Sequence, residues 1–320
     1  MASDDSKISG LRRLKTILRI SYTLPFVMAS LTGVAFALRT ENELLLAFLI
    51  PLDVFLLSLF ANLSNDYFDH KSGADKDRFM EKDPEFREAA YKIMGKKVYW
   101  EGNSFDLKYI SEREGLVLMM ALAAGAVAVA IPILWARGVE VLVLGGIGLF
   151  ISFFYTAPPL NLGAKGYGEM CVFLSFMFMS FFSYWVIVEE FSGTMLLLSI
   201  TVGIGVTMMR LVDEMNGYEI HVSHGEKDLA VRFGLEGAIH IVRALIVVLY
   251  VVVIALAVLN LTYALMLLTA PVAYRITKIL ADKNDRFRFV RPIFNTFMLA
   301  AGNEVLIIIA LTAQTALTYL

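Results

Sequence analysis

Cysteine is almost absent from this chain. Among the 320 residues there is one cysteine, Cys171, and it falls in an apolar stretch. A single thiol excludes an internal disulfide and any metal site built on several cysteines. Histidine is scarce too: four are present, and the pair His221 and His224 lacks the third imidazole or thiolate that a zinc site needs. We therefore expect neither disulfide nor zinc chemistry.

Charged residues are also sparse. They make up 18% of the chain, against 58% apolar residues, and the mean hydropathy is +0.67. Soluble domains contain roughly 45–50% apolar residues. The composition is therefore that of an integral membrane protein. The formal net charge of −2 says little about partners, and we expect membrane lipid and no nucleic acid among them.

Long apolar runs fill most of the chain. Nine of them have the ~17–25 residues needed to cross the hydrocarbon core as helices. Because the runs are continuous and do not alternate with period two, they predict helices and no barrel. The predicted fold is an all-α polytopic membrane bundle of about nine transmembrane helices, in a single domain spanning 1–320. The runs are 16–38, 44–64, 115–135, 139–157, 169–188, 194–212, 237–259, 261–280 and 293–316.

Lysine and arginine are distributed unevenly between the loops. Alternate loops hold 25 of the 28 basic residues, in segments 1–19, 66–114, 158–168, 210–236 and 275–291. The positive-inside rule then predicts a multi-pass protein of the cell membrane with a cytoplasmic N-terminus. Ser104 and Lys227 should lie inside and Leu320 outside. The first fifteen residues show no apolar core before their basic cluster, so we expect no cleavable signal peptide.

The densest polar cluster directly follows the second apolar run. Residues 62–78, NLSNDYFDHKSGADKDR, contain four aspartates and two asparagines. Asn65 and Asp69 are four residues apart and share one face of a helix. Gly73 can adopt the positive φ that ends a helix, which would let Asp75 turn toward the same point. Oxygen ligands that converge in this way suit Mg²⁺ shared with the phosphates of a substrate. The alternative is a polar helix end that is simply solvated.

The residues on either side of this cluster each have more than one interpretation. Arg19 is either an anchor at the membrane surface or a ligand, and Pro25 falls inside the first run, where neighbouring helices can tolerate a kink. The long cytoplasmic loop 66–114 includes a charged, partly helical stretch at 76–98. Loops of this length serve as lids or binding elements, or are plain insertions.

A second polar cluster closes the sixth run. It extends from Arg210 to Asp228 and, like the first, is a cytoplasmic helix end rich in carboxylates. Two such clusters on one side of a bundle can face each other across a cavity. Between them, FYTAPPLNLGAKGYGEM at 154–170 contains two prolines that stop the fourth helix. Lys165 in this loop either contacts an anionic substrate or anchors the loop on the inside.

Three landmarks together resemble the UbiA superfamily of membrane prenyltransferases. NDYFDHKSGAD at 65–75 is similar to its first Asp-rich motif, in the spacing of the menaquinone-pathway branch of 1,4-dihydroxy-2-naphthoate polyprenyltransferases. The loop at 154–170 and GEKDLAVRFG at 225–234 are similar to two further family segments. The resemblance covers nearly the whole chain. It implies that Asn65, Asp69 and Asp75 hold Mg²⁺ and diphosphate.

The second motif departs from the family pattern. Where that branch reads N-E-x-x-D-Y-E-x-D, this chain reads DEMNGYEIH, with Gly217 and His221 in place of two aspartates. One hypothesis is that Asp213, a helical turn before Gly217 on the same face, supplies the missing carboxylate. The competing hypothesis is that the chain binds prenyl diphosphate poorly or uses it otherwise.

The resemblance implies an enzyme that moves a polyprenyl group from its diphosphate to an aromatic, quinone-precursor-like acceptor, with Mg²⁺ assisting ionisation. Competing hypotheses are a non-aromatic lipid acceptor, a cyclisation, a non-catalytic protein that binds prenyl lipids, or a transporter. A transporter is disfavoured because the polar clusters lie at helix ends. The aromatic residues Tyr67, Phe68, Phe154 and Tyr155 are candidates to stabilise an allylic cation. The oligomeric state is open.

The candidate site residues fall into three groups. Catalysis is assigned to Asp69, Asp75, Asp213 and Tyr155. Metal binding is assigned to Asn65, Asp69, Asp75 and Asp213. Substrate binding is assigned to Asn65, Asp66, Arg78, Lys165, Glu214, Glu219 and Lys227.

Overall fold

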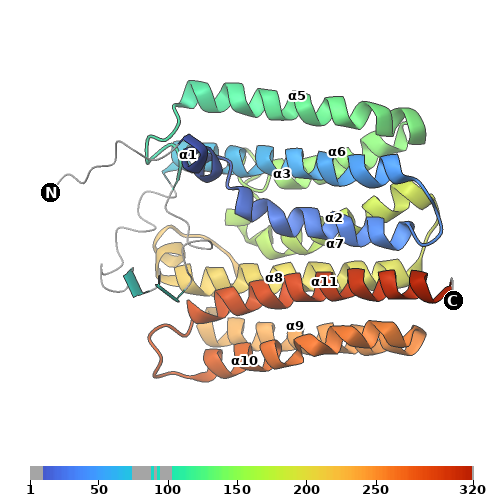
Figure 1. The fold of residues 1–320 in the computed structure, drawn as a ribbon. Coiled ribbons are helices and arrows are strands. Elements are labelled where there is room, and N and C mark those ends of the chain that lie inside the picture. Colours follow the sequence, from blue (N-terminus) through green and yellow to red (C-terminus); the bar gives the residue numbers. More distant parts are fainter. Residues whose placement is uncertain (1–9, 74–87, 90–91, 94–102, 319–320) are drawn as a thin grey trace.

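The computed structural model describes residues 10–73, 88–89, 92–93 and 103–318. Across these residues the chain is helical and forms no strand, which confirms the predicted all-α class (Figure 1). In chain order the elements are α1 (Gly10–Ile17), η2 (Ile20–Thr23), α2 (Leu24–Ala37), α3 (Leu44–Ser72), α5 (Glu112–Arg137), α6 (Glu140–Phe153), η3 (Gly163–Tyr167), α7 (Gly168–Val188), α8 (Gly193–Ser223), α9 (Leu229–Leu259), η4 (Leu261–Thr269), α10 (Ala270–Ala281) and α11 (Arg291–Thr318).

Eight segments of the described chain are long and apolar enough to cross a membrane, and they match eight of the nine predicted runs. The remaining run, 139–157, contains the 14-residue helix α6. At 1.5 Å per residue this helix is about 21 Å long, short of the ~30 Å hydrocarbon core. Its end is followed by Pro158 and Pro159, which have no backbone N–H with which to continue a helix.

The helix α3 is longer than its apolar run. The run ends near residue 64, but the helix continues through the polar residues to Ser72, so the long loop begins at Gly73 rather than at residue 66. Gly73 caps the helix with φ 78°, and its N–H donates to the carbonyl oxygen of Asp69 at 2.9 Å. The predicted turn at Gly73 is confirmed. Most of 76–98 lies outside the described residues.

The first membrane segment breaks before its proline. Arg19 adopts φ 48°, which separates α1 from the helical turn that leads into α2. Pro25 occupies the first turn of α2, where its missing N–H is not required for a helical hydrogen bond. Pro25 therefore lies inside the first membrane segment, as predicted, but at the start of α2, where it does not kink the helix.

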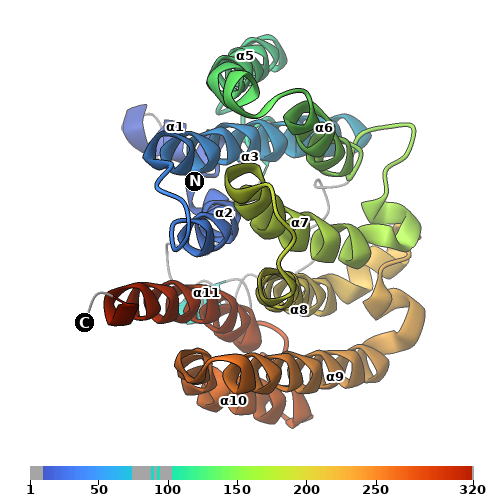
Figure 2. The same cartoon turned by 90° about the vertical axis from the view of Figure 1, so that its right-hand side faces the viewer.

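The helices stack in layers, as Figure 2 shows: α5, then α3 with α6, α2 with α7, α8 with α11, and α9 with α10. The central element is α8, in which 72% of the apolar window is buried, against 22–44% in the other long helices. Helix α7 packs very closely on both sides. A Cβ on Gly33 of α2 would lie 2.0 Å from the carbonyl oxygen of Ser180, and one on Gly203 of α8 would lie 2.8 Å from that of Phe173. Small residues permit such contacts between membrane helices.

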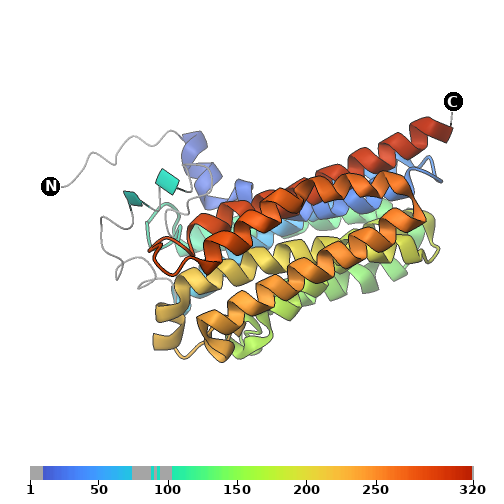
Figure 3. The ribbon, with the colours of Figure 1, turned by 90° about the horizontal axis from the view of Figure 1, so that it is seen from below.

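The segments that carry the polar motifs meet at one end of the bundle (Figures 1 and 3). The end of α3, the start of α7, the end of α8 and the start of α9 all lie there. The turn between α2 and α3 lies at the opposite end. We refer to the end of the bundle where the polar motifs meet as the polar end.

Candidate active site

One face of α3 carries the first set of oxygen donors. Asn65 and Asp69 are four residues apart on this continuous helix, so they project from the same face. Both side chains are half-buried. The hydroxyl of Thr156 donates to Oδ1 of Asn65 at 2.7 Å. The loop after α6 therefore holds this asparagine in place.

Asp66 serves a different contact. Its side chain is fully buried, and Oδ1 lies 2.7 Å from Nη1 of Arg19. The side chain of Asn103 donates to the Asp66 carbonyl oxygen at 2.7 Å, and the backbone N–H of Ser104 donates to Oδ2 at 3.4 Å. Asp66 thus fastens Arg19 and the 103–104 segment to α3. This placement does not favour the assignment of Asp66 to substrate binding, and it shows Arg19 as an internal ion-pair partner.

Two adjacent residues connect the two polar clusters. Thr156 contacts Asn65 on α3, and the ring of Tyr155 lies under the guanidinium of Arg210 on α8, with 5.4 Å between Cζ and the ring centroid. Two adjacent residues of the loop after α6 therefore contact both α3 and α8. The link brings the two polar clusters together at one end of the bundle, and the cavity expected between them stays a prediction.

The cluster on α8 is buried and joins three helices. Carboxylate oxygens of Glu169, Glu214 and Asp228 all lie within 4.8 Å of one another. Arg210 Nε lies 2.6 Å from Oε1 of the fully buried Glu214. Glu169, at the start of α7, accepts a hydrogen bond of 2.5 Å from the backbone N–H of Leu229, at the start of α9. The group therefore ties α7, α8 and α9 together.

His221 extends this network. Its side chain is buried, with Nδ1 2.6 Å from Oδ2 of Asp228 and 3.8 Å from Oε2 of Glu226. Asp228 also caps α9, because its Oδ1 accepts from the N–H of Val231 at 2.8 Å. Burial raises the pKa of the Asp228 carboxyl, but the hydrogen bonds from His221 and Val231 outweigh burial and hold that pKa below its ordinary value.

The two residues that break the family pattern touch each other. A Cβ placed on Gly217 would lie 2.7 Å from Nε2 of His221, closer than real Cβ contacts. The imidazole of His221 therefore fills the space into which a side chain at position 217 would project. The two departures are one coupled change, and an aspartate at position 217 needs His221 to move.

The other predicted residues are more open. Asp213 is half-buried, one helical turn before Gly217, while Glu219 is exposed. Glu214 is enclosed in the network, away from solvent. The exposed Lys165 donates to the Pro159 carbonyl oxygen at 2.9 Å. The exposed Lys227 lies on a loop whose backbone N–H donates to the Ala164 carbonyl oxygen at 3.2 Å, so the loops of the two lysines meet.

Two predicted residues, Asp75 and Arg78, lie outside the described residues. Three others were missed by the sequence reasoning: Thr156, Glu169 and Asp228. A signal was available for Asp228, because an acidic residue directly before an apolar run is a typical helix cap. Glu169 stands in GYGEM, beside the glycines that drew attention to this loop. Nothing in the sequence places either residue next to Glu214.

The chain is similar to several known proteins. The model of the UbiA prenyltransferase family matches residues 108–315. The chain is 23% identical over 246 residues to 1,4-dihydroxy-2-naphthoate octaprenyltransferase of Bacillus subtilis, covering 74% of this chain and 70% of the relative. It is 26% identical over 208 residues to 2-carboxy-1,4-naphthoquinone phytyltransferase of Synechocystis, covering 62% of this chain and 60% of the relative.

The fold is similar to solved structures as well. A UbiA homologue from Archaeoglobus fulgidus, bound to GPP and Mg²⁺, superposes with a TM-score of 0.64 at 16% identity, covering 92% of this chain and 99% of the homologue. The family match covers well over half of the chain. The chain therefore belongs to the UbiA prenyltransferase family, and it is a membrane prenyltransferase.

Proposed function

We propose that the protein transfers a polyprenyl group from its diphosphate to an aromatic, dihydroxynaphthoate-like acceptor. The observation that carries the proposal is the loop at Tyr155 and Thr156, which joins the donors on α3 to the α8 cluster at one end of an apolar bundle. A polyprenyl diphosphate has the matching shape, with a long apolar tail and a charged head. The two curated relatives, which are named for naphthoate and naphthoquinone prenylation, support the aromatic acceptor.

The donor set fits Mg²⁺. Asn65 and Asp69 offer oxygen atoms from one helix face, and Asp213 offers a half-buried carboxylate on α8. Oxygen-only ligands with several positions left for water and phosphate are typical of Mg²⁺ sites. When bound, the ion neutralises charge on the leaving diphosphate. Asp75 belongs to the same proposed set. We infer that Asp213 takes the place of the acids absent at Gly217 and His221.

The remaining groups bind and orient the substrates. Lys165 and Lys227 lie exposed on two loops that meet, where their ammonium groups can bind diphosphate oxygens. Arg78 is proposed for the same role. On α3, the ring of Phe68 packs edge-on against Phe153 at 5.7 Å, which places aromatic rings beside the Asn65 face.

The reaction breaks one bond and forms another. The allylic C–O bond of the donor breaks, and diphosphate leaves with the electron pair. A ring carbon of the electron-rich acceptor then forms a bond to the allylic carbon, and the ring gives up a proton or its carboxyl group as carbon dioxide. Aromatic faces stabilise the intermediate positive charge, and the closed apolar bundle keeps water from capturing it.

We also propose that the polar end faces the cytoplasm. The distribution of lysine and arginine supports this orientation. Ser104 is almost fully buried, so a cysteine there would react poorly with any label. Exposed positions are better: in a Cys171→Ser background, Lys227→Cys should resist a membrane-impermeant maleimide in intact cells, and Thr40→Cys should react. Labelling of Lys227→Cys alone would reverse the orientation.

The function is tested by incubating the purified protein with radiolabelled geranylgeranyl diphosphate, Mg²⁺ and a panel of quinone precursors. We expect a labelled lipid product with a dihydroxynaphthoate acceptor, and its loss with EDTA. A product formed only with a hydroxylated glycerol lipid would replace the aromatic acceptor with a lipid one. Absence of product with every acceptor, in protein that still binds the donor, would contradict transfer.

A further inference from the structure

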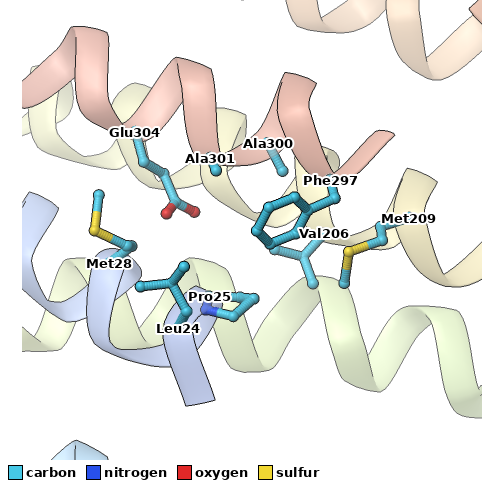
Figure 4. Close-up of a pocket in the computed structure, with 9 residues that line it drawn as sticks. All are labelled: Leu24, Pro25, Met28, Val206, Met209, Phe297, Ala300, Ala301 and Glu304. Atoms are coloured by element: carbon cyan, nitrogen blue, oxygen red, sulfur yellow. The ribbon is translucent and has the colours of Figure 1, made fainter. Parts of the chain in front are cut away.

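A pocket lies deeper in the bundle, between α2, α8 and α11 (Figure 4). All but one of the side chains around it are apolar, and they are Leu24, Pro25, Met28, Val206, Met209, Phe297, Ala300 and Ala301. The exception is Glu304 of α11. Figure 4 shows its carboxyl pointing from α11 toward Met28 and Leu24 of α2.

Glu304 has a carboxyl oxygen that no described residue satisfies. Its side chain is only 2% exposed, and its Oε1 is buried without a hydrogen-bond partner among the described residues. The preceding residue, Asn303, differs, because its Oδ1 accepts from the Thr269 hydroxyl at 3.0 Å. Glu304 lies about 20 Å along α11 from its first residue, by the helical rise. A carboxyl at such depth is costly and indicates a functional site.

The pocket adjoins the candidate active site. Val206 and Met209 lie seven and four residues before Asp213, so all three share one face of α8. Met209 is about 6 Å from Asp213 along the helix axis. The pocket therefore lies directly on the membrane side of the α8 cluster. Leu24, which is 45% exposed, connects it to the outer surface of the bundle.

The lining limits what the pocket can bind. A ligand without any polar group, such as a hydrocarbon tail, would leave the buried Glu304 oxygen without a hydrogen-bond partner, which costs free energy. A compound that bears several charges would leave its other charges against methionine and alanine. The composition suits a largely apolar molecule that places a hydroxyl at the height of Glu304 and directs any charged group toward the polar end. A hydroxyl on an aromatic ring or on a lipid has this chemistry.

We propose that Glu304 accepts a hydrogen bond from a hydroxyl group of the acceptor substrate and positions that acceptor beneath the diphosphate site. This inference rests on the proposed function. In the present conformation the pocket has room for about one water molecule. A two-ring acceptor requires Met28 and Met209 to swing aside. Methionine is suited to this, because its unbranched side chain has three rotatable bonds.

The test compares ligands with and without the hydroxyl, in binding rather than in turnover. Equilibrium binding of 1,4-dihydroxy-2-naphthoate and of 2-naphthoate is measured for the protein in nanodiscs. A second arm uses a glycerol-ether lipid phosphate and its deoxy analogue. The parent should prefer the hydroxylated member of one pair by at least about tenfold, the expected worth of a hydrogen bond to a carboxyl group. The arm in which the preference appears identifies the source of the hydroxyl.

Two variants and a control separate the explanations. Glu304→Leu should abolish the preference while the Kd for prenyl diphosphate stays within about twofold. Glu304→Gln, which keeps the shape and an accepting oxygen, should retain part of it. Asp53→Leu is the matched control, because Asp53 is a membrane carboxyl on α3 whose Oδ1 also lacks a partner in the described chain. This control should keep the full preference.

A preference that survives Glu304→Leu, or a parent with no preference in either arm, would overturn the inference. So would a Glu304→Leu variant that binds prenyl diphosphate more tightly with the hydroxyl preference intact, which would assign the pocket to the prenyl tail. Because the readout is binding, the inference can stand even if no transfer product forms. If transfer proceeds while the hydroxyl preference is absent, the inference about Glu304 fails and the proposed function is unaffected.

Discussion

The two polar helix ends of this molecule hold similar residues in different states. On α3, Asn65 and Asp69 are half-buried and face a loop that contributes a hydroxyl. On α8, Glu214 is fully buried beside Arg210, and its neighbours Glu169 and Asp228 are bound to backbone N–H groups of α9. Carboxylates that already pair with a protein cation, or accept hydrogen bonds from backbone N–H groups, are poor ligands for an added metal.

The side chains at the two helix ends therefore have different roles. The oxygen ligands proposed on α3, Asn65 and Asp69, are half-buried, whereas Glu169, Glu214 and Asp228 at the α8 end form a buried ion network. Such networks are sensitive to the loss of one member, because the partner is then left as an uncompensated buried charge. We therefore expect substitutions on α3 to reduce turnover and substitutions in the α8 network to reduce stability.

The largest effect is expected at Asp69. Asp69→Ala should lower kcat/KM for prenyl transfer by at least about 10³-fold, because the charge of the leaving diphosphate would lose part of its compensation in the transition state. Because Asp69 is only half-buried, the thermal unfolding temperature of this variant should fall less than that of a variant in the buried α8 network. Steady-state kinetics and differential scanning fluorimetry measure the two quantities. Near-normal turnover at saturating Mg²⁺ would remove Asp69 from the proposed metal site.

Arg210 should show the opposite pattern. Arg210→Met removes a cation that faces three buried carboxylates, and it should destabilise the protein by about 3–5 kcal/mol. Glu214→Gln removes one of the three carboxylates and should cost less. Arg232→Met, at an exposed position on α9, is the control and should leave stability unchanged. If Glu214→Gln proved the more damaging change, Arg210 would not be the cation that stabilises this network. Thermal unfolding in detergent ranks the variants.

Much of the fold was predictable from the sequence, because apolar runs of membrane length have few alternatives to helices. The site was less predictable for a physical reason. Asn65 and Asp69 could be paired, since they are one turn apart on one helix. Glu169 and Asp228 are far apart in the chain, and only packing of α7 against α8 and α9 brings them to Glu214. A local pattern also could not show that Asp66 is enclosed by Arg19.

The coupled change at Gly217 and His221 gives a prediction of intermediate size. Gly217→Asp should be destabilised by about 1–3 kcal/mol, because its Cβ would meet the His221 ring. For the same reason it should fail to rescue Asp213→Asn. The rescue should appear only with Gly217→Asp and His221→Ala together, which makes room for the new carboxylate. The test compares the transfer rates of Asp213→Asn alone, of Asp213→Asn with Gly217→Asp, and of Asp213→Asn with both Gly217→Asp and His221→Ala. Rescue by Gly217→Asp alone would show that His221 moves freely.

The smallest effect is expected at Thr156, whose hydroxyl contacts the α3 end of the site. Thr156→Val keeps the shape of the side chain but removes the hydrogen bond of 2.7 Å to Asn65. A single neutral hydrogen bond contributes about 1 kcal/mol, so the Mg²⁺ concentration for half-maximal activity should rise roughly fivefold with little change in the maximal rate. Thr201→Val removes a comparable hydroxyl, which within the described chain bonds to the Leu198 carbonyl oxygen of its own helix, and should leave the Mg²⁺ dependence unchanged. An equal shift in both variants would mean that Thr156 acts on folding and not on the metal-binding face of α3.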